Sequence, residues 1–143
     1  MIITDRHEEL CAWVELGIHG FTNGYDGSSK AIGIERNGKL ICAVTYTNFK
    51  SRKDGSFFEL EMGVFSIDKR WCNRHNLNII FAYPFAQLKL ERVQTICSAD
   101  DEGVIMFNKR LGFTPEGIHR KAWHTGCDAI SWSMLKDECK WLS

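Results

Sequence analysis

Two acidic side chains, Glu59 and Glu61, stand two residues apart in the alternating segment 57–65, which reads FFELEMGVF. Successive side chains of a strand point to opposite faces, so both carboxylates are expected on one face of a sheet. A carboxylate that faces a cleft can take a proton from an amine, directly or through water. The pair is therefore a candidate general base. The alternative is two glutamates on a solvated sheet face.

Positive charge gathers shortly after this strand, in the segment 69–75, which reads KRWCNRH. Its side chains could contact phosphate groups, and an exposed basic loop without a ligand is the alternative. A second basic run, KSRK at 50–53, is expected to be an exposed turn or to contact the phosphates of an acidic acceptor.

The 143 residues suit one domain, which we expect to span 1–143. Eighteen Lys and Arg balance eighteen Asp and Glu, which argues against a protein that coats nucleic acid by charge. No stretch approaches the roughly 20 apolar residues of a membrane span, and the start of the chain does not read as a signal peptide. We therefore expect a cytoplasmic protein without a membrane partner.

The six cysteines form no C-x-x-C pair and fall in different expected elements. That distribution gives little support to a zinc site or a redox centre, and no metal site is expected. The cysteines are interpreted as reduced thiols that pack as small hydrophobic side chains.

The expected elements alternate between the two periods of regular structure. The first half of the chain is expected to contain a helix near 5–17, a turn-rich loop at 20–30, strands at 31–36 and 39–47 joined by Asn37-Gly38, and a strand at 57–65. A helix at 77–88, interrupted by Pro84, and a strand at 92–98 are expected to follow. The last expected elements are a helix from Asp100 or Asp101 to Leu111, ended by Gly112, and strands at 117–124 and 128–135. This order predicts an α+β layered domain with a mixed sheet.

Two short motifs follow one another near the end of the chain. Residues 109–113 read KRLGF, and residues 116–120 read EGIHR. Together with the order of elements, they resemble the GCN5-related N-acetyltransferase (GNAT) family, and most of all its branch that acetylates the N-termini of ribosomal proteins. The resemblance covers about residues 31–136. It implies a mostly antiparallel sheet with splayed parallel strands, and transfer of an acetyl group from acetyl-CoA to an amine.

The resemblance also implies where acetyl-CoA would bind. In the family, two neighbouring parallel strands splay apart around the cofactor, and the N-terminus of the next helix holds the pyrophosphate with backbone N–H groups. Here these strands would be the one that ends near Val64 and Phe65 and the one at 93–98. The candidate cofactor-binding residues are Val64, Phe65, Arg70, Asn73, Arg74, His75, Asn76, Ser98, Asp101 and Asn108.

The chain departs from the family pattern in two places. In the phosphate loop, Asn73 and His75 replace small residues, and Asn73 is expected to supply a turn with positive φ. Asn108 takes the place of a tyrosine that protonates the leaving thiolate in many members. An amide does not titrate near neutrality, so Asn108 is expected to hydrogen-bond the thioester or the CoA sulfur instead. Asp101 stands where the family has an asparagine.

The resulting catalytic candidates are Glu59, Glu61 and Asn108, with His119 and His124 as weaker ones that are expected to be surface residues. The sequence favours an acetyl-CoA-dependent N-acetyltransferase that acts on a protein or peptide amine. Two alternatives stay open. The first is an enzyme like the GNAT-like proteins of bacteriophages that modify DNA bases, which would make nucleic acid a partner. The second is a non-catalytic binding or inhibitor protein of this fold. A homodimer is compatible with all three functions.

Overall fold

The computed structural model of the chain describes residues 1–17 and 25–142. Within them, the strands form a seven-stranded sheet in the order β1-β2-β3-β4-β5-β7-β6. The strands are β1 (Ile2–Ile3), β2 (Lys30–Arg36), β3 (Lys39–Ser51), β4 (Phe57–Ser66), β5 (Arg92–Ser98), β6 (Thr114–His119) and β7 (Ala129–Leu135). Neighbouring strands run antiparallel except β4 and β5, which are parallel. The sheet is therefore mixed and mostly antiparallel, as the sequence predicts.

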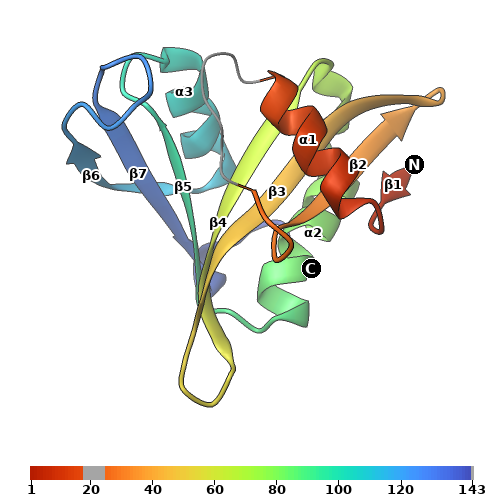
Figure 1. Cartoon of the computed structure of the whole chain (residues 1–143), viewed down its shortest axis with the longest axis horizontal. Helices are drawn as coiled ribbons and strands as arrows, with labels where there is room; N and C mark the ends of the chain where they lie inside the picture. The colour runs from red at the N-terminus through yellow and green to blue at the C-terminus, as the bar shows by residue number, and fades with distance from the viewer. Residues whose placement is uncertain (18–24, 143) are drawn as a thin grey trace.

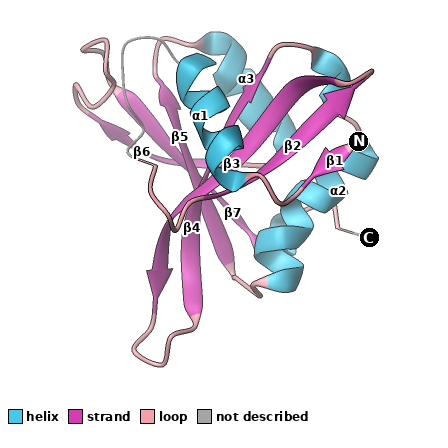
Figure 2. Ribbon diagram, turned by 45° about the vertical axis from the view of Figure 1, so that its right-hand side comes forward, coloured by secondary structure: helices cyan, strands magenta, loops and turns pink. Residues whose placement is uncertain are grey.

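Helices cover both faces of this sheet (Figures 1 and 2). They are α1 (His7–Gly17), α2 (Arg74–Ala82) and α3 (Glu102–Leu111), with the short helical turns η1 (Lys69–Trp71), η2 (Tyr83–Gln87) and η3 (Lys136–Glu138). Helix α1 lies over β2–β4 on one face, and α2 lies on the other (Figure 2). Among the described residues, no helix has the length and apolar character that crossing a membrane requires.

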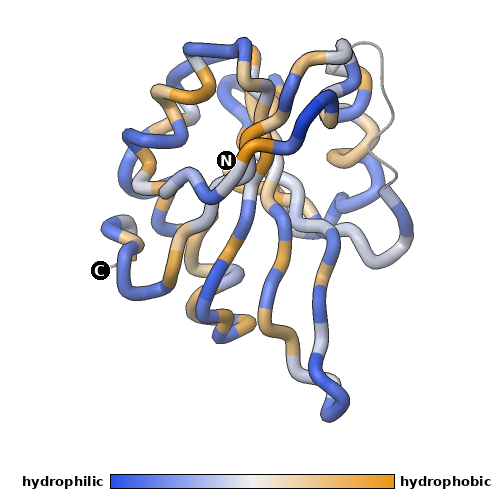
Figure 3. Tube along the Cα trace, turned by 90° about the vertical axis from the view of Figure 1, so that its left-hand side faces the viewer, coloured by the Kyte–Doolittle hydropathy of each residue, from blue (hydrophilic) through white to orange (hydrophobic). Residues whose placement is uncertain are grey.

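Two hydrophobic clusters, one on each face, hold the layers together. The larger one joins α2 and α3 to the sheet and includes Leu60 and Met62 of β4. The smaller one joins α1 to β2 and β3. The hydropathy of the chain alternates along several strands (Figure 3), which is typical of a sheet whose two faces have different neighbours. This alternation places Glu59 and Glu61 on the α1 side and Leu60 and Met62 on the α2 side.

Several local predictions are confirmed. Asn37 and Gly38 both have positive φ, 54° and 77°, as the tight turn between β2 and β3 requires. Gly112 ends α3 in the left-handed conformation, with φ 109°. Asp101 caps the start of that helix by accepting a hydrogen bond from the N–H of Val104 at 3.1 Å. Pro84 lies where α2 passes into the wide turn η2.

Two strands differ from the expectation. Strand β1 is too short to leave a periodic signal in the sequence. Strand β6 occupies Thr114–His119 instead of 117–124, because an edge strand tolerates a proline that has no N–H to donate to a ladder. The expected loop at 20–30 lies partly outside the described residues.

Candidate active site at the diverging strands

Strands β4 and β5 touch at one point and then separate (Figure 1). Their ladder contains a single pair of residues, Glu61 of β4 and Gln94 of β5. One residue further along each strand, the hydroxyl of Thr95 donates a hydrogen bond to the carbonyl of Met62 at 2.9 Å. A side chain thus takes over a link between the strands at the point where the backbone ladder ends.

A narrow cavity of about 40 Å³ lies at this divergence on the α2 side of the sheet. Its lining includes Met62, Val64 and Thr95 from the two strands and Asn108 from α3. Asn108 is 6% exposed, and its Nδ2 has no hydrogen-bond partner among the described residues. A buried donor without an acceptor costs stability unless a ligand supplies one. The side chain of Asn108 therefore suits a ligand that carries a carbonyl or another acceptor.

A second cavity, of about 370 Å³, opens at the same point on the opposite face. It is lined by Glu59 and Glu61 of β4, by Gln94 of β5, and by residues of the β3 edge, namely Asn48, Phe49 and Lys50. The structure therefore brings both predicted glutamates into one cavity, next to the residue pair at which the strands part.

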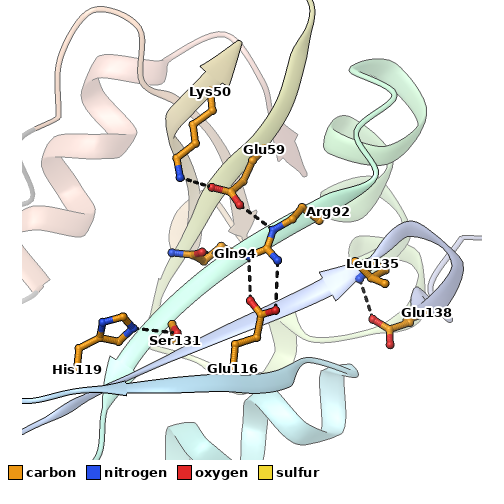
Figure 4. A network of polar contacts seen from close by, with 9 residues as sticks. All are labelled: Lys50, Glu59, Arg92, Gln94, Glu116, His119, Ser131, Leu135 and Glu138. Atoms are coloured by element: carbon orange, nitrogen blue, oxygen red, sulfur yellow. Dashed lines mark hydrogen bonds and ion pairs between the residues drawn. The ribbon is translucent and has the colours of Figure 1, made fainter. Parts of the chain in front are cut away.

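The two glutamates differ in their partners, and Figure 4 shows those of Glu59. Glu59 is buried between two cations: its carboxylate lies 2.8 Å from Nζ of Lys50 and 2.7 Å from Nε of Arg92. Arg92 also pairs with Glu116 of β6 at 2.9 Å and donates a hydrogen bond to Gln94 at 3.1 Å. This network, which we call the Arg92 network, links β3, β4, β5 and β6.

Glu61 forms no ion pair with the described residues. Burial raises the pKa of its carboxyl, a hydrogen bond with the side chain of Asn48 opposes that rise, and the charge of Glu59 adds to it. A raised pKa brings a carboxylate closer to the range in which it accepts a proton efficiently near neutrality. Of the two candidates, Glu61 is therefore the better placed to act as a base.

The segment between β4 and α2 is already hydrogen-bonded within the chain. Asn73 has an extended backbone, φ −136°, so the expectation of positive φ there is wrong. It acts instead as the N-cap of α2, accepting from the N–H of Asn76 at 2.9 Å. The guanidinium of Arg70 lies on the carboxylate of Asp68, 2.6 Å away at its shortest contact. Arg74 donates to the carbonyl of Lys140 at 3.1 Å.

The other candidates for cofactor binding are spread over the same end of the sheet. Val64 lines the narrow cavity, whereas Phe65 points to the opposite face and packs on Trp13 of α1 with ring centroids 5.2 Å apart. Ser98 lies at the end of β5, where its hydroxyl accepts from the N–H of Asp100 at 3.1 Å. Asp101 is the cap of α3, and His75 is exposed.

The two histidines lie away from both cavities. His119 is exposed and contacts the hydroxyl of Ser131 at 3.0 Å, and His124 is exposed beside Trp123. Sequence reasoning did not identify Asn48, Gln94 or Thr95. The sequence predicts a strand at 92–98, but only the pairing with β4 shows which of its residues reach the divergence. No group of three or more His, Cys, Asp or Glu among the described residues could hold a metal ion.

No protein-family profile and no curated protein matches the chain. Solved structures do match it. A mutant of spermidine N-acetyltransferase from Vibrio cholerae superposes with a TM-score of 0.73 at 13% identity, over 100% of this chain and 98% of that one. Ribosomal-protein-S5-alanine acetyltransferase from Vibrio fischeri gives 0.62 at 23% identity, over 78% and 64%. A structure from T. thermophilus that is assigned as an acetyltransferase gives 0.62 at 20% identity, over 79% and 62%.

The chain has the GNAT acetyltransferase fold. The likeness at these identities concerns the fold, and the chain spans less than two thirds of the length of the Vibrio fischeri and T. thermophilus structures. In this GNAT fold, the parallel pair that parts at Glu61 and Gln94 corresponds to the splayed strands that the sequence predicts at the cofactor site.

Proposed function

We propose that residues 1–143 form an acetyl-CoA-dependent N-acetyltransferase. The observation that carries the proposal is the pair of cavities on opposite faces of one strand divergence. On one face, the unpartnered Nδ2 of Asn108 offers a hydrogen bond, and on the other, the carboxylate of Glu61 offers a proton acceptor. The GNAT fold supports the same reaction class, although a fold by itself does not establish an activity.

In the proposed reaction, Glu61 accepts a proton and Asn108 donates a hydrogen bond. Acetyl-CoA supplies an acyl group already activated as a thioester. Glu61 takes a proton from the ammonium form of the acceptor, so that the neutral amine can attack the carbonyl carbon. The new C–N bond then forms and the C–S bond breaks. The second proton of the amine nitrogen passes to the departing thiolate, directly or through water, because position 108 has no titrating side chain to supply one. Asn108 donates its hydrogen bond to the thioester or to the departing sulfur, and Val64 and Thr95 form the walls beside it.

The proposed acceptor is the amine of a protein or peptide. Within the described residues, Glu59 and Glu116 are already paired with cations, which leaves Glu61 as the carboxylate available to a single ammonium group. A polyamine carries several ammonium groups and would find fewer unpaired carboxylates in this cavity. The side-chain amides of Asn48 and Gln94 can both donate and accept, which suits the N–H and C=O groups of a peptide.

Calorimetric titration with acetyl-CoA tests the donor. Binding is expected, and no detectable heat at millimolar cofactor would overturn the enzyme proposal in favour of a non-catalytic protein. Mass spectrometry then tests the acceptor by following the added acetyl mass on peptides, polyamines and oligonucleotides under identical conditions. Acetylated peptides are expected. Transfer to polyamines or to oligonucleotides alone would replace the proposed acceptor while keeping the reaction.

A further inference from the structure

The segment that would hold the pyrophosphate, residues 68–77, has its backbone donors largely in use. Of the eight N–H groups from Arg70 to Leu77, six donate to atoms of the same segment. Arg70 donates to the side chain of Asp68, and Asn76 to that of Asn73. The N–H groups of residues 71, 72, 73 and 77 donate to backbone carbonyls of residues 68, 69, 71 and 73. Two N–H groups remain, those of Arg74 and His75, which is what any capped helix start leaves over.

The guanidinium groups of both arginines in the segment also have partners. The guanidinium of Arg70 contacts both carboxylate oxygens of Asp68, at 2.6 to 3.1 Å. The side-chain and backbone hydrogen bonds from Arg70 lower the pKa of Asp68 to about 2. Its carboxylate is therefore charged at neutral pH and occupies donors that an incoming phosphate would need. Arg74 is turned toward the C-terminal segment, where it lies over the ring of Trp141, 5.8 Å from its centroid.

The narrow cavity where β4 and β5 diverge differs from this segment, because one of its donors is free. There, the Nδ2 of Asn108 is buried and has no partner among the described residues. The amide donor of Asn108 is thus available to an acyl thioester arm, whereas most N–H groups of the segment 68–77 and the guanidinium of Arg70 are already in use. An anion that bound the guanidinium of Arg70 would first have to break its charge-assisted contacts with the carboxylate of Asp68.

We infer that this chain recognises its donor by the acyl-pantetheine arm and draws little affinity from the nucleotide end of CoA. The inference rests on the proposed function, and it widens the donor class to thioesters that carry the arm without the nucleotide. Asn108 and the other residues that line the narrow cavity would then supply most of the specificity for the acyl donor.

Calorimetry with three probes tests the inference. Acetyl-CoA and S-acetylpantetheine are expected to bind with dissociation constants within about tenfold of each other. 3′-Phosphoadenosine 5′-diphosphate, which carries all three phosphates of CoA without the arm, is expected not to compete. A loss of more than about 100-fold on removing the nucleotide, or competition by this nucleotide, would overturn the inference and leave the proposed function intact. Failure of both thioesters to bind would overturn the proposed function itself.

A charge-removing variant gives an independent arm of the test. Asp68→Asn keeps a side-chain oxygen for the N–H of Arg70 but frees its guanidinium, so it should tighten acetyl-CoA binding by about tenfold and leave S-acetylpantetheine binding unchanged. Asp54→Asn is the matched control, because Asp54 accepts from the N–H of Ser56 at 2.9 Å in a similar exposed turn between β3 and β4. If Asp68→Asn and Asp54→Asn have equal effects on acetyl-CoA affinity, the carboxylate of Asp68 does not close the segment and the inference is wrong.

Discussion

Glu59 and Glu61 share a face and a cavity, yet their surroundings give them different chemistry. Two cations hold Glu59, and a base that is already paired gains little by taking a proton. Glu61 forms no such ion pair within the described part of the chain, and both its burial and the negative charge of Glu59 raise the pKa of its carboxyl, which favours taking a proton. The alternation of β4 predicted the shared face. The difference between the residues depends on Arg92 and Lys50, whose contacts no local pattern reveals.

The first prediction concerns Glu61→Gln. Loss of the base should lower kcat by about 100-fold or more without changing donor affinity, because the glutamine keeps the shape but cannot take the proton. In the unchanged protein, kcat/KM should rise with pH through the pKa of Glu61, above the range of an exposed glutamate. That rise should disappear in the variant, as rate measurements between pH 4 and 8 would show.

Glu59→Gln serves as the comparison for this prediction. It leaves Lys50 and Arg92 short of a partner, so it should lower stability while the rise of kcat/KM with pH persists. A Glu61→Gln protein that retained both its rate and its pH profile would remove Glu61 from the mechanism.

The second prediction concerns the unpartnered amide of Asn108. Asn108→Leu replaces a buried donor that has no acceptor by an apolar group of similar size, so the urea midpoint should stay unchanged or rise. The same change should raise the dissociation constant for acetyl-CoA by about tenfold, which corresponds to the free energy of one hydrogen bond.

Asn78→Leu is the control for that experiment. Asn78 is half-buried, but its Nδ2 donates to the carbonyl of Trp141 at 3.0 Å, so the substitution should lower stability and spare donor binding. If Asn108→Leu also destabilised the free protein, the amide would have a structural partner and its assignment to the donor would lose its basis.

At the scale of elements, the separation of β4 and β5 creates both cavities. Parallel strands normally continue their ladder, and here it stops after the pair of Glu61 and Gln94. The hydroxyl of Thr95 satisfies the carbonyl of Met62 just beyond that pair. A side chain in this position lets the strands part without leaving a polar backbone group unpaired.

The third prediction follows from this contact. Thr95→Val preserves the shape of the side chain but removes the donor, which should cost about 1–2 kcal/mol of unfolding free energy. Urea denaturation measures the loss. Thr114→Val on the exposed edge strand β6 should leave the midpoint nearly unchanged. Equal midpoints for the two variants would show that the Thr95 hydroxyl does not support the divergence.

The sequence identified most elements because their signals are local. The turn at Asn37-Gly38, the cap at Asp101 and the end of α3 at Gly112 each depend on neighbouring residues. The pairing of Lys50 with Glu59 does not. It depends on an irregularity between Thr47 and Lys50, where Asn48 has φ 53° and shifts the register of β3 against β4. Such a shift changes which side chains meet, so the contents of the cavity could not be predicted.

For the molecule as a whole, the two hydrophobic clusters determine which thiols are accessible. All six cysteines are free. Cys11, Cys42 and Cys97 are buried as the small hydrophobic side chains that the sequence predicts, whereas Cys72 is exposed and the prediction is wrong for it. Cys11 lies in the cluster beneath α1, and Cys42 and Cys97 lie in the larger one. Burial raises the pKa of these three thiols and of Cys72 as well, so the access of solvent to the sulfur atom, and not the pKa, distinguishes Cys72 from the other three.

The fourth prediction is a pattern of alkylation. In the native protein, iodoacetamide should modify the exposed Cys72 at least about 100-fold faster than Cys11, Cys42 and Cys97, which require the protein to open. Peptide mass spectrometry over time measures each rate. In denaturing urea, the four rates should converge. Comparable rates in the native protein would mean that the two clusters do not protect the thiols.

The Arg92 network also has a consequence for how this chain can change over evolutionary time. Arg92 holds two carboxylates, Glu59 and Glu116, which come from strands far apart in the sequence. Replacing the arginine alone would leave two like charges facing each other, whereas replacing either glutamate alone would leave a cation short of a partner. Substitutions at these three positions are therefore expected to be inherited together, so that related chains carry the whole set or a different set in its place.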